Sequence, residues 1–121
     1  MLNLLQRFGK KAEGIAARHL AKNGYRILEK NYRTRAGEID LIAMDGPTIV
    51  FVEVKARRSD SYGLPKEAVS YHKQKKITMS AQYYLKETGN PDVKARFDVV
   101  SICMAGNRSS IEVVKNAFDL A

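Results

Sequence analysis

The sequence contains little cysteine and no long apolar run. Cys103 is the only cysteine among 121 residues, so an intramolecular disulfide is excluded. No stretch approaches the roughly 20 apolar residues that cross a bilayer, and the opening Met-Leu-Asn-Leu-Leu-Gln-Arg-Phe is too short and misordered for a secretory signal. We therefore expect a protein of the reducing cytoplasm with no membrane partner. Cys103, inside the apolar run 97–104, is expected in the core.

Acidic residues are outnumbered. The chain has 13 Asp and Glu against 21 Lys and Arg, a formal net charge of +8. Such an excess is typical of a protein that binds a polyanion, although some basic proteins are only kept soluble by it. The basic residues gather at 26–35, 55–58 and 73–76. We predict DNA as the partner, contacted by Arg33, Arg35, Arg57, Arg58, Lys73 and Lys76.

Two apolar runs, 37–42 and 49–55, are separated by a short Gly- and Pro-containing turn and predict a β-hairpin. The register of this hairpin decides where its acids point. A four-residue loop pairs Asp40 with Glu53, and it also matches apolar residues down the ladder. A three-residue loop sets Asp40 opposite Val52, on the other face, because a slip of one residue turns every side chain over.

Glu53 and Lys55 point to the same face of their strand, because side chains alternate. With Asp40 beside Glu53, this face offers two carboxylates to one cation. Oxygen ligands of this kind suit Mg²⁺ or Mn²⁺. Lys55 is then placed to orient an attacking water or to stabilise charge on a phosphate. For the Glu-x-Lys triplet alone, the alternative is an ion pair without chemistry.

A third acid lies on the first helix, which we predict over 10–22, with Asn23-Gly24 as its stop. Glu13 falls among the apolar positions of this helix, inside the arc that faces the protein. A carboxylate in that position must be paired or bind a cation. The alternative is that Glu13 only borders the core and pairs with an arginine such as Arg18.

The remaining apolar patterns predict further elements. Asp98, early in a strand, either joins the site or pairs with an arginine such as Arg96, and we leave it out of the catalytic set. No repeat, low-complexity tract or domain boundary is visible, so residues 1–121 are expected to form one domain. The predicted elements are strands over 25–32, 95–104 and 111–115, a polar loop over 59–65 and a helix over 66–88.

A glutamate in the first helix, followed by Asp and Glu-x-Lys on neighbouring strands, resembles the PD-(D/E)xK nuclease superfamily, and especially the archaeal Holliday-junction resolvases. A narrower resemblance is to the YraN-like family of small bacterial proteins, and it covers nearly the whole chain from Gly9 to about Val114. It is carried by Gly9-Lys10-Lys11-Ala12-Glu13, Asn31-Tyr32-Arg33, Gly37-Glu38-Ile39-Asp40-Leu41-Ile42, Phe51-Val52-Glu53-Val54-Lys55, Pro65-Lys66-Glu67-Ala68-Val69 and Arg96-Phe97-Asp98-Val99-Val100.

The resemblance implies an α/β fold, a central mixed sheet flanked by helices. It also implies an active site of Glu13, Asp40, Glu53 and Lys55 around a divalent metal, with the three acids as ligands and the lysine positioning the water. The second motif reads Glu-Ile-Asp instead of Pro-Asp, as is usual among resolvase-like members.

The sequence therefore predicts a cytoplasmic metal-dependent endonuclease that hydrolyses phosphodiester bonds in DNA, branched or single-stranded, using Mg²⁺ or Mn²⁺. The alternative is a structure-selective nucleic-acid-binding module that does not cut. Two acids facing a polyanion favour the enzyme, because a pure binder gains nothing from them. A homodimer is a further expectation, because resolving a junction requires two cuts.

Overall fold

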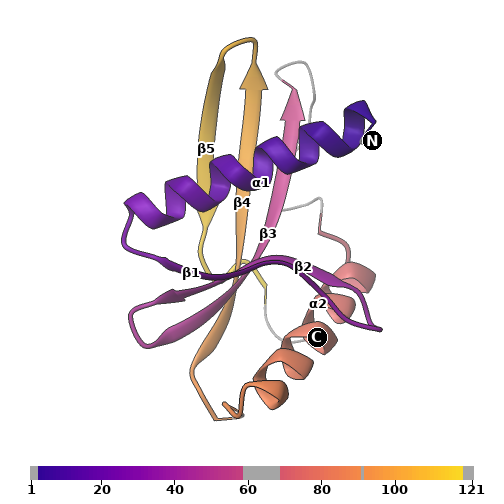
Figure 1. Ribbon diagram of the computed structural model, residues 1–121, viewed down its shortest axis with the longest axis vertical. Coiled ribbons are helices and arrows are strands. Elements are labelled where there is room, and N and C mark those ends of the chain that lie inside the picture. The colour runs from indigo at the N-terminus through magenta and orange to yellow at the C-terminus, as the bar shows by residue number, and fades with distance from the viewer. Residues whose placement is uncertain (1–2, 59–68, 91, 119–121) are drawn as a thin grey trace.

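The computed structural model describes residues 3–58, 69–90 and 92–118. Their elements follow the order α1 (Leu4–Lys22), β1 (Arg26–Arg33), β2 (Glu38–Asp45), β3 (Thr48–Arg58), α2 (Tyr71–Glu87), β4 (Ala95–Ala105) and β5 (Arg108–Val114). The strands form one five-stranded sheet in the order β1-β2-β3-β4-β5. Only β3 and β4 run parallel within it. The predicted α/β fold with a mixed sheet and flanking helices is confirmed (Figure 1).

The buried apolar residues form two clusters, one under each helix. The α1-side core includes Ala16 and Leu20 of α1 together with Val50 and Val52 of β3. The α2-side core includes Ile77 of α2 together with the alternate β3 residues Ile49 and Phe51. Since strand side chains alternate between faces, the two helices cover opposite faces of the sheet.

The helix ends differ from the predicted bounds. Helix α1 begins six residues earlier than position 10, because Asn3 and Gln6 form a reciprocal capping box at its start. Helix α2 begins at Tyr71, after Ser70, whose side chain accepts the N–H of Lys73 at 3.1 Å. The predicted loop over 59–65 and the first three positions of the predicted helix lie outside the described residues. No described helix has the length and hydropathy of a membrane-spanning segment.

The β2–β3 hairpin has the register that brings the two acids together. Met44 pairs with Ile49 and Ile42 with Phe51, as the four-residue loop required. Asp45 and Thr48 also pair, so the connection itself is shorter than expected and consists of Gly46 and Pro47.

Candidate metal and nucleic-acid site

The β2–β3 ladder ends just before the two acids. Its last pair is Leu41 with Val52, and beyond it the alternation of β2 breaks, since Ile39 packs in the α2-side core and Leu41 in the α1-side core. The Asp40 carboxylate accepts the backbone N–H of Val54 at 2.8 Å. The Asp40 side chain thus accepts a backbone N–H of β3 at a point where the β2–β3 ladder has ended.

Strand β1, on the other side of β2, is also irregular beside Asp40. Asn31 lies between Lys30 and Tyr32, which pair with β2, so it stands opposite Asp40. Its φ is +53°, in the left-handed region, which asparagine tolerates better than most residues. The irregular backbone at Asn31 and the end of the β2–β3 ladder at Leu41 thus lie together at Asp40.

Glu53 lies on the face of β3 that packs beneath α2, next along that face after Phe51. It is 5% exposed, and its Oε1 lies 2.9 Å from the ammonium nitrogen of Lys73 on α2. Lys55 follows on the same face by strand alternation, near enough for the positive charge of Lys73 to act on its ammonium. The site therefore contains two carboxylates, Asp40 and Glu53, and two lysines.

The charges of these groups are coupled. Burial, followed by the negative charge of Glu53, raises the pKa of Asp40 to about 8, although the Val54 N–H opposes this shift. Burial and the positive charge of Lys73 lower the pKa of Lys55. Burial also acts to lower the pKa of Lys73, but the hydrogen bond to Glu53 and its charge outweigh it, so that this pKa is raised. The carboxylate pair therefore still favours an added proton or cation.

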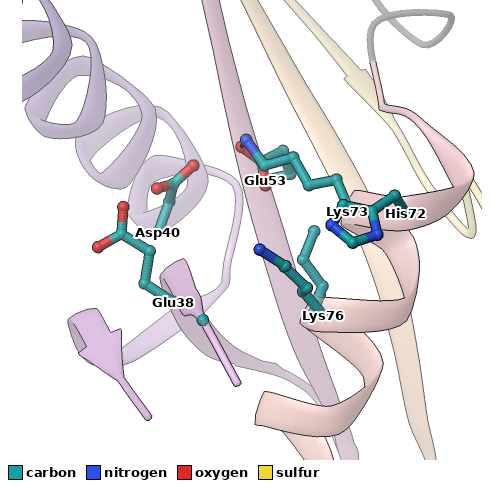
Figure 2. Close-up of a pocket in the computed structure, with 8 residues that line it drawn as sticks. Glu38, Asp40, Glu53, His72, Lys73 and Lys76 are labelled. Carbon is teal, nitrogen blue, oxygen red and sulfur yellow. Dashed lines mark ion pairs between the residues drawn. The ribbon is translucent and has the colours of Figure 1, made fainter. Parts of the chain in front are cut away.

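A hollow of about 320 Å³ opens beside this pair, between β2, β3 and α2. Figure 2 shows the carboxylates of Glu38 and Asp40 on one side and the side chains of Lys73 and Lys76 reaching in from α2 on the other. His72 also lines it. Carboxylates and cations thus face each other across an opening that a phosphate could enter.

The tip of the β1–β2 hairpin is fixed to α2, which sets the width of this hollow. Thr34 Oγ1 and Ser80 Oγ are hydrogen-bonded at 2.9 Å, and Ser80 is fully buried. At Gly37, a Cβ atom would lie 3.4 Å from the Cβ of Lys76, so this backbone approaches the helix closely. The distance between Asp40 and the lysines of α2 therefore depends on the Thr34–Ser80 hydrogen bond and on the close approach of Gly37 to Lys76.

Glu13 is not gathered with the other two acids as the sequence predicted. Its negative charge raises the pKa of Asp40 less than burial and Glu53 do, and it lines a neighbouring hollow of about 510 Å³ with Asn31 and Arg33. Among the described residues, no three acid, histidine or cysteine side chains are close enough to hold one metal ion. The reason is that α1 packs on the face of the sheet opposite α2. Glu38 lines both hollows.

The predicted DNA-contacting residues occupy different surroundings. Lys73 and Lys76 line the hollow at the carboxylates. Arg33 and Arg35 are exposed near the hairpin tip, and Arg33 Nε forms an exposed ion pair with Glu38 at 3.5 Å. Arg57 lines a third hollow with Ser101 and Cys103, and Arg58 is the last residue of β3. Lys73 is consequently part of the site and not of a solvated helix face.

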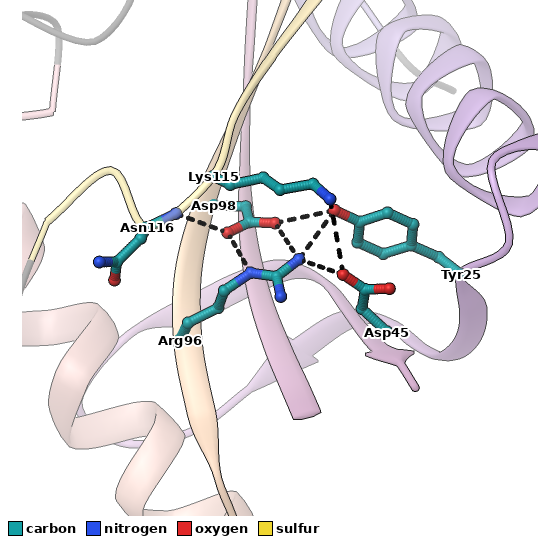
Figure 3. Close-up of polar contacts among 6 residues, drawn as sticks. All are labelled: Tyr25, Asp45, Arg96, Asp98, Lys115 and Asn116. Carbon is teal, nitrogen blue, oxygen red and sulfur yellow. Dashed lines mark hydrogen bonds and ion pairs between the residues drawn. The ribbon is translucent and has the colours of Figure 1, made fainter. Parts of the chain in front are cut away.

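Asp98 belongs to a separate polar cluster on the α1 side of the sheet (Figure 3). It is fully buried, and it accepts hydrogen bonds from Arg96 at 2.9 Å, from the Tyr25 hydroxyl at 3.2 Å and from the N–H of Asn116 at 2.9 Å. Arg96 also binds Asp45 at 2.7 Å. Asp98 therefore takes the arginine-pairing alternative. Cys103 is only partly buried, so the expectation that it lies in the core is wrong.

A divalent cation fits the donor set of Asp40 and Glu53. Hard oxygen donors suit Mg²⁺ and Mn²⁺, and Mg²⁺ commonly binds one or two protein carboxylates while keeping several waters. Burial first, and then the negative charge of Glu53, raises the pKa of Asp40, and a bound cation would offset both effects. The residues that would hold the ion are these two acids.

Fold and site together define a small α/β protein with a mixed sheet, in which a carboxylate pair at the break of a β-hairpin faces lysines from a helix. The chain belongs to the uncharacterised protein family UPF0102, the YraN-like family, whose model matches residues 12–102. The resemblance to the YraN-like family is thereby confirmed.

The similarity to individual members extends over almost the whole length. A UPF0102 protein of Desulfosudis oleivorans is 51% identical over 119 residues, which cover 98% of this chain and 95% of that protein. One of Syntrophus aciditrophicus is 53% identical over 115 residues, 95% of this chain and 91% of the relative. One of Geobacter metallireducens is 49% identical over 113 residues, 93% of both.

Proposed function

We propose that this protein is a metal-dependent endonuclease that binds DNA and hydrolyses its phosphodiester bonds. The observation that carries the proposal is the pair Asp40 and Glu53, drawn together in a hollow that two lysines of α2 also line. Like charges held together, with Glu53 buried and Asp40 half-buried, normally destabilise a protein, so a structural role does not account for the pair. A requirement for a cation does.

Each group has a part in this chemistry. Asp40 and Glu53 would hold a Mg²⁺ or Mn²⁺ ion. Such an ion, when bound, lowers the pKa of water and polarises a phosphoryl oxygen. Lys55, partly buried beside them, would orient the nucleophilic water and stabilise the charge that develops on the phosphate. Lys76, exposed at the hollow, would hold a neighbouring phosphate. Glu13 is proposed only as a group near the site that acts on Asp40 through its charge.

A second candidate function is a nucleic-acid-binding module that does not cut. The ion pair between Lys73 and Glu53 favours it, because this contact satisfies a buried carboxylate without any metal. The two candidates make different demands on Asp40. A binder needs no charge there, whereas the nuclease requires it.

The deciding experiment measures cleavage of a panel of labelled DNAs, both single-stranded and branched, by highly purified protein with Mg²⁺ or Mn²⁺. Wild-type protein should cut and should stop when a chelator is added. Asp40→Asn should not cut and should bind DNA equally or slightly more tightly, because one repulsive carboxylate is removed. Asp92→Asn, which changes an exposed acid between α2 and β4, is the matched control and should retain cleavage. If the wild type binds but cuts nothing on the panel, the binding-module alternative replaces the nuclease.

A further inference from the structure

Lys73 bonds to a carboxylate that a divalent ion would also need. Its ammonium nitrogen lies 2.9 Å from Glu53 Oε1, and the Glu53 side chain is 5% exposed. The Lys73 side chain is 44% exposed. One partner of this ion pair is therefore fixed inside the protein, while the other reaches it from the solvent side.

A lysine ammonium and a divalent ion compete for the same oxygen. The ammonium is a single charge on a flexible four-carbon stem with three donors, and it can satisfy only part of a carboxylate pair. Its bond is to Glu53 Oε1, whereas the Asp40 carboxylate accepts the N–H of Val54 at 2.8 Å. The single positive charge of Lys73 therefore stabilises the metal-free site but does not neutralise both carboxylates.

The Lys73 ammonium also has a second position that it could occupy, beside Lys76 at the same hollow. Lys73 stands in the first turn of α2, and Lys76 lies one turn further along the same side of the helix, exposed at the same hollow. Figure 2 shows both side chains pointing from α2 toward the opening. Rotation of the Lys73 stem away from Glu53 would leave its ammonium beside that of Lys76, where two like charges attract an anion.

We infer that Lys73 is a displaceable counter-cation, which holds Glu53 in the metal-free protein, yields it to a divalent ion and then binds a phosphate of the substrate. This inference rests on the proposed function and adds regulation to it. Metal and phosphate then assist each other, since the ion releases the lysine that the phosphate uses. By linkage, the phosphate must strengthen metal binding by the same factor.

The first test measures Mn²⁺ binding without DNA, from the electron paramagnetic resonance signal of the free ion. Lys73→Met keeps the apolar stem and removes the competitor, so it should bind Mn²⁺ about tenfold more tightly than wild type, the effect of losing one charge-assisted bond. Lys75→Met is the matched control, because Lys75 is exposed on the same helix and does not line the hollow. Its Mn²⁺ affinity should equal that of wild type.

The second test measures the coupling. A short phosphorothioate oligonucleotide, which resists cleavage, should tighten Mn²⁺ binding by the wild type and by Lys75→Met. It should tighten binding by Lys73→Met much less, because the lysine that connects the two ligands is absent. Equal tightening in all three proteins would mean that Lys73 does not couple them.

A third test uses the wild type alone, so that it holds even if Lys73→Met fails to fold. In ¹⁵N-lysine spectra, the ammonium signal of an ion-paired Lys73 should be protected from exchange and should change when Mg²⁺ is added. An unchanged signal at saturating Mg²⁺, in wild-type protein that binds Mn²⁺, would overturn the inference and leave the proposed function standing. Absence of Mn²⁺ binding in every variant would overturn the metal site itself.

Discussion

Asp40 and Val54 are joined by a hydrogen bond in which the side-chain carboxylate accepts a backbone N–H at 2.8 Å. The acid therefore has two roles, since it closes the ladder where β2 leaves β3 and it supplies a charge to the site. An amide oxygen can accept the same N–H. Replacing Asp40 with asparagine thus separates the two roles, because it keeps the bond and removes the charge.

Stability should depend on pH through Asp40. Its pKa is raised to about 8 in the folded protein, whereas the unfolded chain has the ordinary value near 4. Between these values the folded state binds more protons than the unfolded state, so this group lowers stability as pH rises from about 4 to about 8. The slope can reach at most about 1.4 kcal/mol per pH unit.

Chemical denaturation of the wild type and Asp40→Asn at several pH values would measure this dependence. The variant should show a flatter profile and should be the more stable protein at pH 8. Asp92→Asn should follow the wild type. A wild-type profile that is no steeper than that of Asp40→Asn would contradict the raised pKa.

Lys55→Ala should abolish cleavage and leave Mn²⁺ binding largely in place. The reason is that Lys55 contributes a charge near the reacting phosphate but no oxygen ligand. Single-turnover cleavage and Mn²⁺ titration on the same preparation would separate the two effects. If Lys55→Ala lost as much Mn²⁺ affinity as Asp40→Asn, Lys55 would act by stabilising the two carboxylates and not by contacting the phosphate.

DNA binding should weaken steeply with salt, because each phosphate neutralised on duplex contributes a slope of roughly −0.9 in a plot of log affinity against log salt. Charge reversal at Arg57 and Arg58 should weaken binding for all sequences and reduce this slope. Fluorescence anisotropy at several salt concentrations measures both quantities. Lys94→Glu, at an exposed position before β4, serves as the control for net charge. Binding that is insensitive to salt would exclude the predicted contacts between these arginines and DNA phosphates.

Asp98→Ala should destabilise the fold without acting on the chemistry. It leaves the Arg96 guanidinium without a buried carboxylate partner, a loss that typically costs about 3–5 kcal/mol. Tyr25→Phe removes one hydroxyl from the same cluster and should cost about 1–2 kcal/mol. Urea unfolding measures both values. If instead Tyr25→Phe were as stable as wild type and inactive at 20 °C, the cluster would belong to the site.

Short-range patterns in the sequence were sufficient for much of the fold. The apolar alternation of β2 and β3 and the turn between them predicted a register that pairs Met44 with Ile49 and Ile42 with Phe51, and these pairs are confirmed. The helix predicted over 66–88 is also present as α2 from Tyr71 to Glu87, with Ile77, Ala81 and Tyr84 buried. These features depend on neighbours a few residues apart, which a sequence displays directly.

The remaining features depend on how distant elements pack. Glu13 was placed with the other acids because its position on the helix faces inward, but a helical pattern does not say which face of the sheet the helix covers. Lys73 was predicted as a DNA contact, and its ion pair with Glu53 was not foreseen. In a sequence, a lysine on a helix surface looks the same whether it contacts solvent or a buried glutamate. The bond from Tyr25 to Asp98 joins residues 73 positions apart, which no local pattern reveals.

The short β2–β3 connection also bears on the order in which the protein folds. Asp40 and Glu53 belong to one hairpin with a two-residue connection, so we expect them to meet through local contacts that form early. Lys73 belongs to α2, which lies between the parallel strands β3 and β4 in the sequence, so we expect its contact with Glu53 to form later. The two carboxylates would then be opposed before their lysine arrives, and we expect a divalent ion to speed refolding, which stopped-flow measurements with and without Mg²⁺ would test.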